Sequence, residues 1–135
     1  MSEPRDTRTS SIEIDIEADA AYAVLADTRH IPLWAPGFAD VVEPSGGDEF
    51  EATKDGRRFS LRIVRRADSR TIDFLRQIYP SRDSGASIRV LPGPQRGCVV
   101  VVTLPIPPGI DGDAVQETLE AELVAIAALV GDPPR

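Results

Sequence analysis

The sequence has a single cysteine, Cys98, and a single histidine, His30. One cysteine excludes an intrachain disulfide, and the position of Cys98 in an apolar run favours a small buried side chain over a reactive one. Together the two residues cannot supply the usual His/Cys ligand sets of a metal site. The glycines follow no phosphate-binding pattern. We therefore expect neither a metal site nor a cofactor.

Lysine is almost absent as well: Lys54 is the only lysine among 15 basic residues, and the net charge is −7. This charge argues against nucleic acid, whose binding depends on clustered Lys and Arg on the phosphates. No apolar run approaches the roughly 20 residues of a membrane span. The polar residues 1–11 do not resemble a signal peptide. These absences predict a cytoplasmic protein with no membrane span and no nucleic-acid partner.

The chain length of 135 residues fits one domain. We expect residues 1–10 to form a flexible tail and residues 11–131 to form that single domain. Isoleucine alternates with acidic residues over 11–17, which predicts a half-buried strand. Two short helices should follow, and Pro36 and Gly37 end the second.

Residues 39–104 have the pattern of six antiparallel strands joined in sequence order. Asp55-Gly56 is a strong signal for a two-residue hairpin turn. Apolar residues recur at every second position on the two strands after this turn. They are Phe59, Leu61 and Ile63 on the first strand, and Ile72 and Phe74 on the second.

The chain ends in a predicted long helix. Asp113 is the expected N-cap, with Gln116 completing a capping box. An apolar stripe follows at intervals of three or four residues, and Leu119 and Leu123 belong to it. Strands with one apolar face need a cover, and only this helix is long enough to provide it. The fold class is therefore α+β, and a curved sheet wrapped around a helix leaves a concave gap where small ligands bind.

Residues 27–38, DTRHIPLWAPGF, resemble the segment between the first strand and the following strands in the START-like, Bet v 1-like (SRPBCC) superfamily. This superfamily includes polyketide cyclases and aromatases, coenzyme-Q-binding proteins, plant allergen-type carriers and lipid-transfer domains. The chain is most similar to the polyketide cyclase/dehydrase and lipid-transport group. The resemblance implies a helix-grip fold: a curved antiparallel sheet of about seven strands around the C-terminal helix, with two short helices after the first strand and a hydrophobic cavity.

Trp34 and Phe38 stand at the positions where a tryptophan and a phenylalanine wall the cavity of the aromatase/cyclases. Arginines on neighbouring strands also enter that cavity, and Arg65 and Arg76 match them by strand parity. The strand aromatics of those enzymes are replaced here by Leu61 and Ile63, and the sheet loops are short, so we expect a small cavity. Alternatively, Trp34 and Phe38 only fill the open end of the sheet as part of the core.

An arginine on an apolar face needs an anion, a polar ligand or water, because burying an unpaired guanidinium is costly. Alternatively, such a side chain reaches solvent at a strand end. Glu122 borders the helix stripe, where it either pairs with an arginine across the cavity or faces solvent. His30 lies near Asp27, but the sequence offers no nucleophile to complete a triad.

The candidate ligand-binding residues come from the second short helix, two strands and the terminal helix. They are Trp34, Phe38, Phe59, Leu61, Ile63, Arg65, Phe74, Arg76, Leu119, Glu122 and Leu123. The leading interpretation is binding of a small, mostly hydrophobic molecule, aromatic or acyl, in the cavity. One alternative is a polyketide cyclase or aromatase with the two arginines as oxyanion stabilisers. Another is a protein-interaction module with a filled core.

Overall fold

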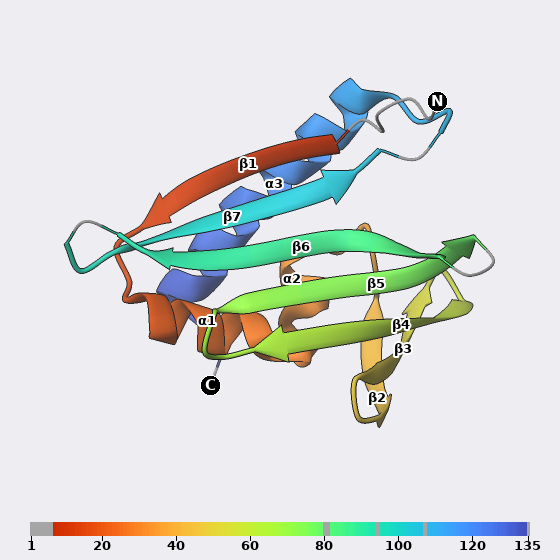
Figure 1. The fold of residues 1–135 in the computed structure, drawn as a ribbon, viewed down its shortest axis with the longest axis horizontal. Coiled ribbons are helices and arrows are strands. Elements are labelled where there is room, and N and C mark those ends of the chain that lie inside the picture. The colour runs from red at the N-terminus through yellow and green to blue at the C-terminus, as the bar shows by residue number, and fades with distance from the viewer. Residues whose placement is uncertain (1–6, 80–81, 94, 107, 135) are drawn as a thin grey trace.

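A computed structural model describes residues 7–79, 82–93, 95–106 and 108–134 (Figure 1). The elements in chain order are β1 (Thr7–Ile14), α1 (Ala18–Ala26), a 3-10 turn (Thr28–His30), α2 (Ile31–Trp34), β2 (Val41–Gly46), β3 (Glu49–Lys54), β4 (Arg57–Arg66), β5 (Thr71–Tyr79), β6 (Arg82–Pro92), β7 (Cys98–Pro105) and α3 (Gly112–Gly131).

The strands form one seven-stranded antiparallel sheet in the order β1-β7-β6-β5-β4-β3-β2. Figure 1 shows α3 running diagonally behind the sheet, with the short helices on the same side. This arrangement confirms the α+β helix-grip fold. The strands β2 to β7 follow one another, and β1 closes the far edge by pairing with β7.

The first strand starts earlier than the isoleucine alternation predicts. Thr7 pairs with Pro105 at the end of β7, so the ladder includes residues 7–10, which we expected in a flexible tail. Residues 1–6 of that tail lie outside the described residues. The strand also ends at Ile14 rather than at residue 17, because the chain turns there toward α1.

The predicted hairpin at Asp55-Gly56 is confirmed. Lys54 pairs with Arg57 across the turn, and φ is +51° at Asp55 and +78° at Gly56. A two-residue turn with positive φ at both positions matches the twist of the flanking strands. This turn fixes the register of β4, which decides which of its side chains face the helix.

The core lies between α3 and the concave face of the sheet. The apolar stripe of α3 is buried, and Leu119 and Ile126 are 0% exposed. Alternate residues of each central strand meet it, as period-two alternation requires. Examples are Leu61 and Ile63 on β4, Ile72 and Phe74 on β5, Ile88 and Val90 on β6, and Val100 and Val102 on β7. No charged or polar residue of the described part is fully buried.

The capping box predicted for α3 is wrong. The N-cap is Asp111, whose side chain accepts a hydrogen bond of 3.0 Å from the backbone N–H of Asp113. Gln116 instead donates to Glu120 one turn later, at 3.2 Å. Asp111 and Asp113 are both suitable caps, and the first one has the extended backbone that a cap needs.

Packing of α3 predicts the effect of truncating its central leucine. Leu119→Ala should lower the free energy of unfolding by about 2–5 kcal/mol, since Leu119 is 0% exposed. Val124 on the same helix is 67% exposed, and Val124→Ala should stay within about 0.5 kcal/mol of the wild type. Urea unfolding of both variants checks this. Equal, small losses would mean that α3 is not the cover of the sheet.

Candidate functional site

A pocket of about 80 Å³, which we call the inner pocket, lies beneath α3. Its walls come from α2 and the residues after it, from β5, β6 and β7, and from α3. The aromatic walls are Trp34, Phe38 and Phe74, and the aliphatic ones include Ile31, Ala35 and Leu104. Two ionisable residues, Arg76 and Glu122, complete it. The space equals that of two or three waters at about 30 Å³ each, well below the roughly 300–1,000 Å³ of typical ligand pockets.

Trp34 carries a buried polar atom in the wall of the inner pocket. It is 4% exposed and contacts Phe74 edge to face, with ring centroids 5.8 Å apart. Its indole Nε1 is buried and has no hydrogen-bond partner among the described residues. A buried donor without an acceptor costs about 1–3 kcal/mol, and native proteins leave few such groups. An acceptor atom on a ligand would satisfy it.

Glu122 brings a carboxyl group from α3 to the inner pocket. Burial raises the pKa of this group from 4.5 to about 7. No described cation lies within ion-pair distance of it, so the alternative in which Glu122 pairs with an arginine is not found among the described residues. Near neutral pH the carboxyl group therefore exchanges between a proton-donating and a proton-accepting form.

The two candidate arginines do not meet. Arg76 lines the inner pocket, with its guanidinium carbon 4.1 Å from the centre of the Phe59 ring. Arg65 instead donates a hydrogen bond of 3.1 Å to the carbonyl of Ala26, the last residue of α1. Its guanidinium also lies 5.5 Å from the Phe50 ring. Arg65 thus satisfies a free carbonyl at a helix end, and it is not among the residues that line the inner pocket.

The other candidates divide between the pocket rim and the packed core. Phe59 pairs with Phe38 at 5.4 Å between ring centroids but does not line the inner pocket. The aliphatic candidates Leu61, Ile63, Leu119 and Leu123 are buried in the core and do not line it either.

Sequence reasoning missed several residues of the pocket wall: Ile31, Ala35, Gly85, Ala86 and Leu104. Strand parity could have found two of them. Ala86 lies two residues before the buried Ile88, and Leu104 lies two residues after the buried Val102.

The contacts of His30 indicate a structural role. Its Nδ1 lies 2.7 Å from the carbonyl oxygen of Val24, and since a carbonyl only accepts, Nδ1 carries the proton. Its Nε2 is 3.8 Å from Asp27. Hydrogen bonds from Arg29 lower the pKa of that aspartate to about 2. These contacts join α1 to the turn before α2 and involve no nucleophile.

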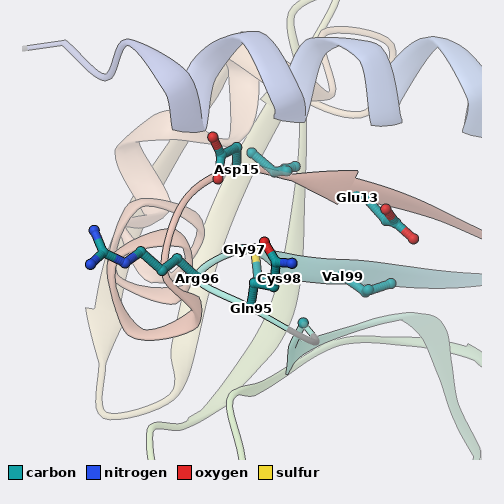
Figure 2. Close-up of a pocket in the computed structure, with 9 residues that line it drawn as sticks. Glu13, Asp15, Gln95, Arg96, Gly97, Cys98 and Val99 are labelled. Atoms are coloured by element: carbon teal, nitrogen blue, oxygen red, sulfur yellow. The ribbon is translucent and has the colours of Figure 1, made fainter.

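A second hollow, of about 590 Å³, lies at the opposite end of the sheet, where β1 ends beside the β6–β7 hairpin. Figure 2 shows that the charged side chains of Glu13, Asp15 and Arg96 point in different directions there. They do not converge on a common ligand group, so we regard the inner pocket as the candidate site.

Two further features are absent from the described part of the chain. No three His, Cys, Asp or Glu side chains there are grouped so that they could hold a metal ion. No helix there is long and apolar enough to cross a membrane.

The sequence matches one protein family over residues 6–130: polyketide cyclase / dehydrase and lipid transport. The match covers nearly the whole chain, and the protein therefore belongs to this family. Among curated proteins, none matches the chain.

Several solved structures have the same fold. The di-domain ARO/CYC BexL from the BE-7585A biosynthetic pathway is 20% identical, with a TM-score of 0.70 over 95% of this chain and 48% of that one. The chain thus spans about half the length of that protein. A START superfamily protein from Mycobacterium smegmatis is 15% identical, with a TM-score of 0.68 over 95% and 99%. The Zhui aromatase/cyclase from Streptomyces sp. R1128 is 16% identical, with a TM-score of 0.62 over 98% and 97%. At such identities the likeness shows the fold alone.

The buried carboxyl group predicts a specific pH dependence. The native state holds the proton of Glu122 up to a pKa of about 7, whereas the unfolded chain releases it near 4.5. The unfolded chain therefore binds fewer protons between these values, and the free energy of unfolding falls as pH rises through them. Relative to Glu122→Gln, the free energy of unfolding of the wild type should fall by at most about 3 kcal/mol across this pH window.

Urea unfolding of both proteins from about pH 4 to about pH 9 measures this difference. Glu117→Gln, at an exposed position of the same helix, is the control and should track the wild type. If the difference between the wild type and Glu122→Gln is flat with pH, Glu122 is hydrated and the pocket is open to water.

Proposed function

We propose that the protein binds a small, mostly hydrophobic molecule in the inner pocket, held by a hydrogen bond from the indole N–H of Trp34. The observation that carries this proposal is the buried Nε1 without a partner among the described residues, on a residue that lines an otherwise apolar pocket. Apolar walls provide affinity, and one or two polar groups fix orientation. Family membership supports the proposal, since the family includes lipid-transport proteins.

The ligand class follows from the polar groups. An indole N–H only donates, so it requires an acceptor such as a ketone, ester or ether oxygen. The protonated form of Glu122 can donate to the same oxygen. A purely hydrocarbon ligand would leave both groups unsatisfied at a cost. The pocket therefore favours a molecule with an apolar body and an oxygen acceptor.

Two probes of equal size separate these contributions: cyclohexanone and methylenecyclohexane, which has a carbon in place of the ketone oxygen. The wild type should bind the ketone more tightly. Trp34→Phe keeps an aromatic ring but removes the donor, and it should weaken ketone binding about threefold to tenfold, as expected for one hydrogen bond. Binding of the hydrocarbon should stay within about twofold of the wild type.

Calorimetric titration measures the affinity of the wild type and of Trp34→Phe for each of the two probes. Equal effects of Trp34→Phe on both probes would mean that Trp34 only shapes the pocket. If the wild type binds neither probe, the alternative of a filled core used as a protein-interaction surface gains support.

A second candidate function is an enzyme, and the pKa of Glu122 near 7 favours it. With an acid-base group near neutrality beside an N–H donor, the pocket could remove water from a β-hydroxyketone. Glu122 would take the proton next to the carbonyl while Trp34 stabilises the enolate oxygen. The same proton would then leave with the hydroxyl group as water.

This alternative predicts that the protein converts a small β-hydroxyketone to the enone. The absorbance of the enone measures this reaction. Glu122→Gln should abolish the reaction, and Glu117→Gln should leave it unchanged. If the wild type binds the probe but forms no enone, the protein is a binding protein for this class of ligand.

A further inference from the structure

The inner pocket is separated from a larger hollow by a thin partition. An open groove of about 680 Å³, which we call the outer groove, lies beyond Phe38 and Phe59. Phe38 and Arg76 line both hollows. Phe38 contacts Phe59 edge to face at 5.4 Å, and the guanidinium of Arg76 covers the Phe59 ring at 4.1 Å. These three side chains form the partition.

A ligand of typical size that reaches the inner pocket must extend past the partition. The inner pocket, at about 80 Å³, holds less than such a ligand, whereas the outer groove, at about 680 Å³, lies within the usual range. Phe59 is fixed in β4 beneath Arg76. Phe38 lies in the connection between α2 and β2, outside any helix or strand. The side chain of Phe38 is therefore less constrained by the sheet than that of Phe59.

The outer groove is cationic in a chain whose net charge is −7. Lys54, Arg57, Arg58 and Arg76 line it, with Asp55 as the single acidic residue. Lys54 already pairs with Asp40 and Asp55, at 3.3 and 3.8 Å, and Arg58 pairs with Glu51 at 3.6 Å.

Two of these cations are uncompensated. Within the described part of the chain, neither Arg57 nor Arg76 forms an ion pair with a carboxylate. Both arginines contribute to the same groove, where a carboxylate could contact either or both. The acidic group of the inner pocket, Glu122, disfavours an anion at that end.

We propose that the ligand is an oxo carboxylic acid that spans both hollows: its carbonyl oxygen contacts Trp34 in the inner pocket, and its carboxylate binds Arg57 and Arg76 in the outer groove, where Phe38 has swung aside. This proposal rests on the proposed function for the inner end of the ligand and adds the anionic outer end. The polarity of the site then runs from an apolar, hydrogen-bonding interior to a cationic mouth.

A matched pair of probes tests the anionic end: 7-oxooctanoate and its methyl ester, which share the ketone and the chain. The wild type should bind the acid more tightly than the ester. Arg57→Gln and Arg76→Gln should each weaken the acid about fivefold to tenfold at low salt, and added salt should reduce this loss because the groove is open to solvent. Arg57 does not line the inner pocket, so Arg57→Gln should change ester binding by no more than about twofold.

Arg89→Gln is the control, because it removes the same charge from an exposed position on β6, beside the inward-facing Ile88 and Val90. If the wild type binds ester and acid equally, and the arginine variants change neither, the outer-groove proposal is wrong while the inner-pocket function stands. If the wild type binds neither probe, both proposals are wrong.

The partition is tested separately by Phe38→Ala. This variant removes the side chain that must move, so the acid should associate severalfold faster, as followed by the fluorescence of Trp34, the only tryptophan. Thermal melting shows whether the variant is folded, and Phe38→Leu provides a milder opening if it is not. Unchanged association rates in the folded variants would mean that the ligand does not pass at Phe38.

Discussion

Packing of α3 across the concave face of the sheet is the contact on which the rest of the structure depends. The α3 stripe buries Leu119, Leu123 and Ile126 against alternate residues of the central strands. These contacts fill most of the space that a curved sheet encloses. Space remains where α2 brings Trp34 under the helix and where α3 carries Glu122 in place of an apolar residue. The same packing that stabilises the fold therefore sets the position and the size of the pocket.

The pocket contains two groups whose burial opposes folding. The indole N–H of Trp34 has no acceptor among the described residues, and burial raises the pKa of Glu122 to about 7. Each group lowers stability, and proteins keep such local conflicts mainly at functional sites. Under the proposed function, an oxygen-bearing ligand would give both groups a hydrogen-bond partner. The fold supports binding and catalysis alike, and the difference here is whether Glu122 only donates a hydrogen bond or transfers its proton.

Period-two alternation explains how much could be predicted from the sequence. It placed the side chain of Arg76 on the face shared with Ile72 and Phe74, because residues two apart on a strand face the same side. Alternation does not specify what lies at a strand end. Arg65 has the same parity on β4 as the buried Leu61 and Ile63. It nevertheless donates a hydrogen bond to the last carbonyl of α1, and this contact depends on how the helix packs. The partition between Phe38 and Phe59 likewise joins segments whose distance only the folded chain determines.

The central claim is that the indole N–H of Trp34 is the hydrogen-bond donor for the ligand, and NMR can observe this group alone. The chain has one tryptophan, so an ¹⁵N-labelled sample gives a single indole N–H signal. Titration with cyclohexanone should move that signal downfield to saturation, because the proton gains an acceptor, and methylenecyclohexane should not produce this downfield shift. An indole signal that stays in place while backbone amides around the inner pocket respond to the ketone would contradict the account.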